Sequence, residues 1–335
     1  MKRTYTFDDV ALVPQFNNVP SRTEPSLETW LTHGRKIRIP LLAANMDSVI
    51  GESLAHILLA NGSLPIFHRF APFSVQKKWV KCFSGGTFVS AGIRLEALAE
   101  TRQLLDAGAI GVCIDVAHGH SDKMFQLIAE LKRSHPEKEI IAGNVCTPMA
   151  YHDLVNAGAD AVKVGVGPGA ACTTRMITGF GVPQFTAIQE CASIAEKLRI
   201  PLIADGGIRN SRDVVLALAA GASSVMIGKL FALTTESAAP KRERSDGVWE
   251  AKYRGQASED FQTDFFGCLK EKTVAEGVGF WAPVSGSVEE LIGTLLGGVR
   301  SGLTYGGARN IKELQRKAEF VEVTASYLTE SLPRQ

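Results

Sequence analysis

The chain has 335 residues, 45% of them hydrophobic, with 36 basic and 35 acidic side chains and a formal net charge of +1. This length and composition allow one large α/β domain or two smaller ones. The balanced charge argues against nucleic acid or an anionic membrane as partner, so a small ligand is expected. The chain is charged from Lys2 and has no run of about 20 apolar residues, so we expect a cytoplasmic protein without a signal peptide or membrane span.

Short apolar segments recur along the chain after a leader expected over residues 1–40. They are nearly continuous in apolar residues, as in strands of a parallel sheet that is covered on both faces. Eight such strands are predicted, at 41–44, 64–67, 88–91, 111–115, 139–142, 161–164, 202–205 and 224–227.

Amphipathic stretches lie between most of these strands. Ala-Gly-Ala at 107–109, 157–159 and 220–222 fits a helix that ends on a glycine cap. Helices are predicted at 97–106, 123–133, 148–156 and 212–219, with two more at 289–300 and 311–320. The alternation favours a single (β/α)₈ TIM barrel over residues 1–335, with an open doubly wound sheet as the alternative. Residues 236–287 do not fit the repeat and are predicted to form an active-site lid inserted after strand 8.

Two glycine-containing loops follow the last two predicted strands. They contain Asp205, Gly206 and Gly207 in the first loop and Gly228 and Lys229 in the second. Barrel enzymes often bind phosphate on these loops, where glycine backbone amides approach the oxygens at a helix N-terminus. We therefore expect a phosphate group here, although the glycines also suit plain tight turns.

The loop after the sixth strand carries the clearest chemical signal. It reads Gly-Val-Gly-Pro-Gly-Ala-Ala-Cys-Thr-Thr-Arg from Gly165 to Arg175. Small residues make Cys172 approachable, and backbone dipoles with Arg175 favour its thiolate, so Cys172 is predicted to be a nucleophile. The carbonyls of Gly167, Gly169 and Cys172 are a weaker hypothesis for a monovalent cation such as K⁺.

Together with Ala-Asn-Met-Asp-Ser-Val at 44–49, Ala-Gly-Asn-Val at 142–145, Asp-Gly-Gly-Ile at 205–208 and Glu276-Gly277, this loop resembles the IMP dehydrogenase and GMP reductase family. The resemblance covers essentially the whole chain. It implies that Cys172 adds to carbon 2 of a purine nucleotide and that hydride moves between that carbon and a nicotinamide. It further implies that Thr174 assists proton transfer, that Glu276 is the acid or base, and that the protein is a homotetramer.

The resemblance also assigns binding roles along the barrel mouth. The substrate, GMP or IMP, would contact Asp205, Gly206, Gly207, Gly228, Lys229, Tyr253, Gly255, Gln256, Ala257 and Gly277. The cofactor would contact Asp115, His118, Asn144 and Ser48. Asp115 and Asn144 end predicted strands, where barrel catalytic residues belong, although a strand-end Asp also caps helices.

Two features of the chain favour GMP reductase within this family. Only residues 69–87 separate the second and third strands, where many IMP dehydrogenases carry paired CBS modules. Between Gly255 and Glu276 there is no Arg and no Tyr, although dehydrogenases use an Arg-Tyr pair to activate water. The expectation is NADPH-dependent reductive deamination of GMP to IMP through a Cys172 thioimidate, within purine salvage. The alternative is an IMP dehydrogenase without CBS domains, which converts IMP and NAD to XMP.

The chain departs from the family at three positions. Ala170 replaces a phosphate-binding serine, Lys229 replaces a glycine or serine, and Gln256 replaces a methionine beside the purine. Lys229 could compensate for Ala170 as a point charge on phosphate. Two further alternatives are a flavin-dependent barrel enzyme, which the cysteine loop argues against, and a nucleotide sensor without catalysis.

Overall fold

The structure is a computed structural model and describes residues 1–269 and 271–333. Seven parallel strands form a curled sheet with the order β4-β10-β9-β8-β7-β6-β5. Their bounds are β4 Leu41–Ala43, β5 Phe88–Ala91, β6 Gly111–Asp115, β7 Glu139–Val145, β8 Ala161–Val164, β9 Leu202–Asp205 and β10 Ser224–Ile227. Because residue after residue along these strands is buried, they form the centre of the core.

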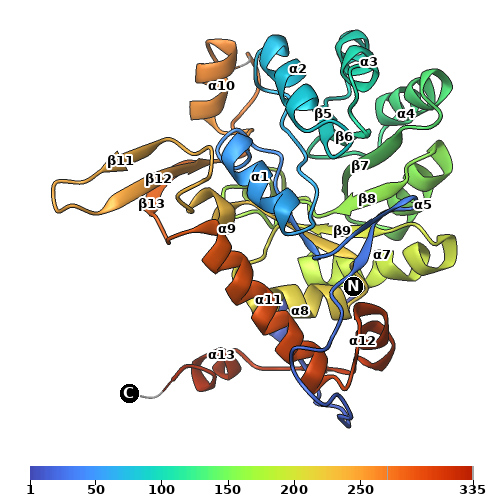
Figure 1. The fold of residues 1–335 in the computed structure, drawn as a ribbon, viewed down its shortest axis with the longest axis vertical. Helices are drawn as coiled ribbons and strands as arrows, with labels where there is room; N and C mark the ends of the chain where they lie inside the picture. The colour runs from blue at the N-terminus through green and yellow to red at the C-terminus, as the bar shows by residue number, and fades with distance from the viewer. Residues whose placement is uncertain (270, 334–335) are drawn as a thin grey trace.

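Helices cover the outside of the sheet, as Figure 1 shows for α3, α4, α5 and α7 along one side. The helices are α1 Glu52–Ala60, α2 Phe73–Cys82, α3 Leu98–Asp106, α4 Asp122–Ser134, α5 Pro148–Ala157, α6 Thr174–Thr178, α7 Gln184–Leu198, α8 Ser211–Ala219 and α9 Lys229–Ala232. Helix caps that the sequence indicates are present in the structure, as α5 shows. Thr147 accepts a hydrogen bond from Ala150 N at the start of α5, and Gly158 ends that helix in the left-handed conformation.

The α/β, TIM-barrel-like fold predicted from the strand and helix alternation is confirmed. One predicted strand, at 64–67, is reduced to a single parallel bridge between Ile66 and Phe88. Pro65 can accept the hydrogen bond from Phe88 N at 3.0 Å but has no N–H of its own to donate. A ladder of strand length therefore does not form at this position.

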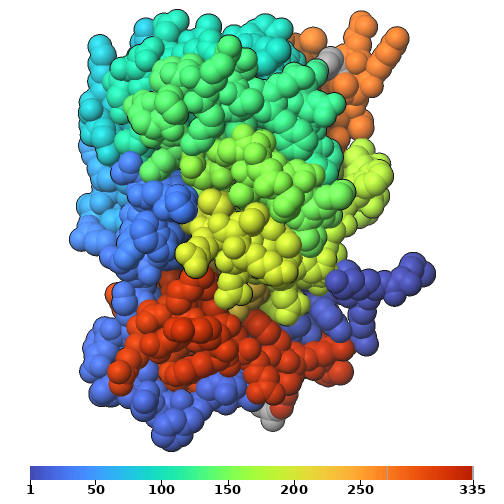
Figure 2. All heavy atoms as spheres, turned by 90° about the vertical axis from the view of Figure 1, so that its right-hand side faces the viewer, coloured from blue at the N-terminus to red at the C-terminus, as the bar shows by residue number. Residues whose placement is uncertain are grey.

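The two ends of the chain meet on one side of the barrel. The leader contains the 3₁₀ turn η1 Phe7–Asp9, β1 Val10–Leu12 and the hairpin of β2 Thr29–Thr32 with β3 Arg35–Ile37. β1 pairs antiparallel with β14 Phe320–Glu322. Figure 2 shows the N-terminal and C-terminal segments adjoining at one end of the molecule. The predicted helix at 311–320 therefore ends early, as α12 Ile311–Lys317, because Ala318 is already extended toward the β14 pairing.

The segment after β10 leaves the barrel and returns to it. It contains the antiparallel sheet β11 Lys241–Glu243, β12 Trp249–Arg254 and β13 Gly279–Pro283, and the short helix α10 Glu259–Phe266. In Figure 1 the β11–β12 hairpin projects away from the barrel and α10 stands beside α2. The chain then closes with α11 Val288–Tyr305, α12 and α13 Ser326–Glu330. Over 1–269 and 271–333, none of the helices combines the length and apolar character needed to cross a bilayer.

Candidate active site

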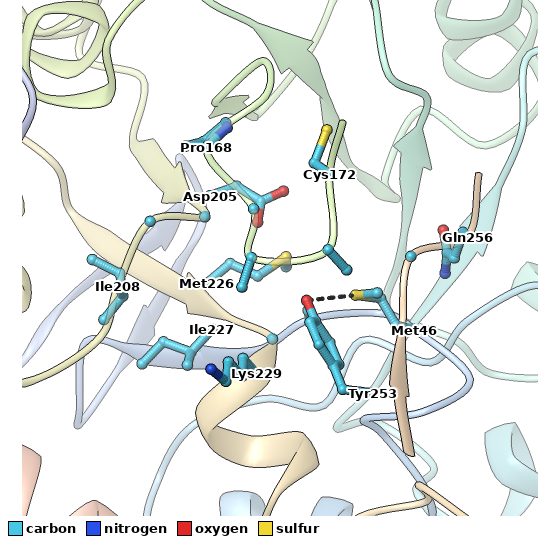
Figure 3. Close-up of a pocket in the computed structure, with 18 of the residues that line it drawn as sticks. Met46, Pro168, Cys172, Asp205, Ile208, Met226, Ile227, Lys229, Tyr253 and Gln256 are labelled. Carbon is cyan, nitrogen blue, oxygen red and sulfur yellow. Dashed lines mark hydrogen bonds between the residues drawn. The ribbon is translucent and has the colours of Figure 1, made fainter. Parts of the chain in front are cut away.

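A cavity of about 460 Å³ opens at the carboxyl ends of the strands. Figure 3 shows Cys172, Asp205, Met226 and Lys229 around this one pocket, with Tyr253 and Gln256 contributed by the lid segment. The predicted residues that line it are Gly169, Cys172, Thr174, Asp205, Gly206, Gly207, Gly228, Lys229, Tyr253, Gly255, Gln256, Ala257 and Glu276. The cysteine loop, both glycine loops and the lid thus converge on one cavity.

Cys172 is exposed and begins a chain of hydrogen bonds. Its Sγ donates to Thr174 Oγ1 at 3.2 Å, and Thr174 Oγ1 donates to Glu276 Oε2 at 2.9 Å. Thr174 is only 9% exposed, so its hydroxyl is held between the thiol and the carboxylate. The arrangement gives the thiol proton a path to a carboxylate, which is how a weak nucleophile is activated.

The lid approaches the cysteine loop through backbone contacts that require glycine. Val278 N donates to Ala171 O at 2.9 Å, and Cys172 forms an antiparallel bridge with Gly277. A Cβ on Gly255 or on Gly277 would lie 3.0 Å from Ala171 O. Gly277 therefore acts through close packing of backbone rather than by lining the cavity.

The two predicted phosphate loops lie on the cavity wall. Gly206 and Gly207 have φ values of +91° and +83°, which glycine adopts without strain. A Cβ on Gly228 would lie 2.5 Å from the hydroxyl of Tyr253, so glycine lets the ring pack over this loop. Burial raises the pKa of Tyr253 above its usual range, so the phenol stays neutral. Lys229 lines the cavity at the start of α9 and is the cation of this loop.

Two of the residues assigned to the cofactor, Asp115 and Asn144, are not among the residues that line this cavity and belong to one polar network with Asp205. Asn144 Nδ2 donates to Asp205 Oδ2 at 2.9 Å and to Gly165 O at 2.8 Å. Lys163 Nζ donates to Asp115 Oδ1 at 2.9 Å and to Asp205 Oδ2 at 3.0 Å. The network connects the strand ends of β6, β7, β8 and β9.

The remaining assigned residues take different positions. His118 is exposed in the loop after β6. Ser48 is fully buried outside the cavity lining, and its hydroxyl is hydrogen-bonded to the backbone of Arg254 in the lid strand β12. Gln256 Nε2 donates to Asn45 O at 2.8 Å, which ties the lid to the loop after β4.

The carbonyls suggested for a monovalent cation lie in the cysteine loop. Gly169 O accepts a hydrogen bond from Cys172 N at 3.0 Å. The side chain of Arg175 lies against Gly167 and its Nε donates to Val166 O at 3.1 Å. The cation role of Gly167, Gly169 and Cys172 stays a prediction.

Comparison with known proteins identifies the family. The model of a protein family described as "IMP dehydrogenase / GMP reductase domain" matches residues 4–334. This chain belongs to the IMP dehydrogenase / GMP reductase family. A protein named inosine-5'-monophosphate dehydrogenase from Cryptosporidium parvum is 36% identical over 377 aligned residues, which cover 97% of this chain and 94% of that protein.

Two bacterial members of this family are more similar in sequence over a shorter alignment. Proteins named inosine-5'-monophosphate dehydrogenase from Aquifex aeolicus and Chlorobaculum tepidum are 47% and 44% identical over 248 and 253 residues. These alignments cover 72% and 73% of the chain but only 50% and 51% of those proteins. The chain thus spans about half the length of these relatives.

These relatives correct the prediction of a GMP reductase, which is wrong. All three are named for IMP dehydrogenase. The prediction depended on the short segment 69–87 and on the missing Arg-Tyr pair, and it assumed that the Cys172 adduct then had no route to hydrolysis. It did not consider that Glu276, already assigned as the acid or base, could serve the hydrolysis as well; the structure joins this carboxylate to Cys172 through Thr174. A missing pair of side chains therefore did not identify the member of the IMP dehydrogenase / GMP reductase family.

Three residues with a part in the site were assigned no role from the sequence. Met46 and Arg209 line the cavity, and both were within reach of the quoted motifs, because Met46 stands inside the motif at 44–49 and Arg209 directly follows the motif at 205–208. Lys163 was missed because it stands inside a predicted strand. Its signal was available, since a lone lysine in a fully buried strand must have a partner of opposite charge.

Proposed function

We propose that this protein is an oxidoreductase that converts IMP to XMP with NAD as hydride acceptor. The observation that carries the proposal is the hydrogen-bond chain from Cys172 through Thr174 to Glu276 at the cavity wall. The names of its relatives support IMP as substrate and a dehydrogenase reaction, which requires an oxidised acceptor such as NAD.

In the proposed reaction Cys172 loses its proton to Glu276 through Thr174, its thiolate forms a bond to carbon 2 of IMP, and the proton passes from Glu276 to the adjacent ring nitrogen. Carbon 2 then gives up hydride, which NAD would accept when bound, and the ring nitrogen releases its proton to solvent, which leaves a thioimidate and an ionised Glu276. Water adds to that carbon, the carbon–sulfur bond breaks, and XMP is released as the thiol is regenerated. The hydrolysis also requires a base, and Glu276 acting through Thr174 is placed to take the proton of the water.

The nucleotide would lie with its phosphate on the two glycine loops. Backbone amides at Gly207 and Gly228 suit phosphate oxygens. Gly206 N donates instead to Met226 O at 3.4 Å. The ammonium of Lys229 supplies positive charge on the same wall. This cation would take over from the hydroxyl that Ala170 lacks. Asp205 would accept from the ribose hydroxyls, and Gln256 would lie beside the purine.

The cofactor half of the site contains a hydrogen-bond acceptor that suits a ligand. Asn144 Oδ1 is buried and receives no hydrogen bond from the residues that the structure describes. An unpaired buried acceptor is costly, so a ligand with an N–H donor fits here. Asn144 and Asp115 would orient the nicotinamide riboside over carbon 2, with His118 at the outer rim.

A homotetramer in the cytoplasm is part of the same proposal. Met176 and Phe180, 87% and 77% exposed, follow the cysteine loop and give it an apolar rim that suits contact with another subunit. Sedimentation of the purified chain measures the assembly.

The deciding experiment pairs two substrate sets and follows nicotinamide absorbance. NADH formation from IMP and NAD is expected, with no NADPH consumption in the presence of GMP. The Cys172→Ala variant should show no turnover and still bind IMP. Consumption of NADPH with GMP, or no turnover with either pair, would overturn the proposal.

A further inference from the structure

Lys163 is a charged residue inside the barrel that the proposed reaction does not use. It lies in β8, where its neighbours are alanine and valine, and only 1% of its side chain is exposed. Its ammonium contacts Asp115 Oδ1 at 2.9 Å and Asp205 Oδ2 at 3.0 Å. One buried cation thus joins the carboxylates at the ends of β6 and β9.

The ammonium of Lys163 stays charged although it is buried. Burial alone would lower the pKa of Lys163, but the two carboxylates outweigh it and hold that pKa above its usual range, so the ammonium is permanent. Two other groups of β6 and β10 face it, the buried thiol of Cys113 and Met226 Sδ, the latter at 3.7 Å from Nζ. Arg69, from the loop before α2, also interacts electrostatically with Asp115.

Further hydrogen bonds fix how the carboxylates are turned. Asp205 Oδ2 also accepts from Asn144, and Asp115 Oδ2 accepts from Asn45 Nδ2 at 3.0 Å. Within residues 1–269 and 271–333 no group donates to Asp205 Oδ1, and Figure 3 shows this carboxylate directed into the pocket. Asp205 therefore presents one free acceptor oxygen to the cavity while its other oxygen is saturated.

We infer that Lys163 is a positioning residue that couples the substrate half of the site to the cofactor half, holding Asp205 and Asp115 in place as acceptors for the hydroxyls of two ligands. The inference rests on the proposed function for the identity of those ligands. The coupling follows from the geometry, because one ammonium contacts both carboxylates.

Removal of the ammonium would change the protonation of the pair. Two carboxylates that share one site repel, and one of them then takes a proton at a higher pH than an isolated carboxyl group does. A protonated carboxyl group donates a hydrogen bond where the ligand hydroxyl also donates. Ligand binding in Lys163→Met should therefore weaken as the pH falls.

The experiment measures IMP binding by calorimetry between pH 6 and 9. Lys163→Met is expected to lose about tenfold in affinity for each pH unit below the pH at which the pair takes its proton, beyond any change in the wild type. The phosphate of IMP titrates equally in both proteins. Lys132→Met removes a lysine that pairs with one carboxylate, Asp160, outside the site and should follow the wild type. Equal affinity and equal pH dependence in Lys163→Met and wild type would overturn the inference.

A double variant covers the case in which Lys163→Met does not fold. Lys163→Met with Asp115→Asn has no repelling pair, so it should fold and bind IMP with the pH dependence of the wild type. A pH dependence that persists in this double variant contradicts the inference.

The outcome is separable from that of the proposed function. Absence of turnover with IMP and NAD in the wild type counts against the reaction only. Without any ligand, the folded Lys163→Met variant should bind an extra proton as the pH is lowered. The difference between its thermal unfolding midpoint and that of the wild type should therefore shift in favour of the variant as the pH falls from 8 to 6. A constant difference in midpoint over that range counts against the role of Lys163 only.

Discussion

At the scale of single residues, reactivity depends on Glu276, which ends the hydrogen-bond chain from Cys172. Glu276→Gln keeps the shape of the side chain and removes the base. We expect kcat to fall by about 10²–10⁴-fold, the usual contribution of a general base, with little change in IMP affinity. Steady-state kinetics with IMP and NAD, together with calorimetric binding, measure both.

The control for this variant is Glu271→Gln, a change of the same kind at an exposed lid position. Its kcat should equal that of the wild type. If Glu276→Gln retained full kcat, another group would have to remove the proton, and the chain through Thr174 would have no catalytic role.

The residues of this site differ in how far the sequence could predict them. Cys172, Gly206 and Gly228 belong to local motifs whose chemistry does not depend on distant contacts. The contact between Thr174 and Glu276 joins residues 102 positions apart, and only the family resemblance suggested it. The bridging role of Lys163 needed three strands to be placed together, which no local pattern gives.

At the scale of elements, the lid helix α10 is held by an aromatic cluster beside the barrel mouth. Phe261 is 1% exposed and meets Phe70 edge to face with ring centroids 4.6 Å apart. Arg254 of β12 connects the same helix to the barrel, since it contacts Asp264 in α10 and Asp47 after β4. Lys252 of β12 also pairs with Asp260 of the helix at 2.8 Å. The helix therefore has one buried side chain and two ionic contacts as its main attachments.

Phe261→Ala is expected to detach α10 locally, because truncation of a buried phenylalanine costs about 3–5 kcal/mol and Phe261 is the one buried side chain of this helix. Proteolytic cleavage within residues 259–275 should become faster, and kcat/KM should fall as the lid leaves the cavity. Limited proteolysis with mass spectrometry locates the cleavage.

Phe266→Ala in the same helix is the matched control, since Phe266 is 55% exposed. Its cleavage rate should stay at that of the wild type. Equal protection of residues 259–275 in both variants would show that α10 is held by other contacts.

The helices and strands also show which features a local sequence pattern cannot predict. The strands and most helices follow from apolar periodicity and glycine caps, which act within a few residues. The end of α12 does not, because β14 forms only by pairing with β1, whose residues lie about three hundred positions earlier. Pro65 is a second case, because its lack of a backbone N–H limits strand pairing only when β5 lies beside it.

At the scale of the whole molecule, the leader is tied to the catalytic face by an ion pair. Arg209 directly follows the loop of Gly206 and Gly207, and its guanidinium donates to Asp8 Oδ2 at 2.8 Å and to Asp213. The hydrogen bond from Arg209 lowers the pKa of Asp8. The start of the chain thereby supports the predicted phosphate loop.

This pKa shift predicts how stability depends on pH. A carboxyl group with a lowered pKa in the folded state stabilises the protein above its unfolded pKa, about 3.9, and this contribution is lost as the pH falls through the folded pKa. Asp8 is partly exposed, so after solvent screening Asp8→Asn should cost about 0.5–1 kcal/mol at pH 7. Urea unfolding at pH 7, 5, 4 and 3.5 should show the wild type and the variant converging only at the two lowest values.

The control for Asp8→Asn is Glu137→Gln, which changes an exposed carboxylate without a hydrogen bond or ion pair to the described residues and should match the wild type throughout. Because Asp8 holds Arg209 beside the glycine loop, its loss should also raise the KM for IMP; a stability difference with an unchanged KM would restrict the leader to a role in folding.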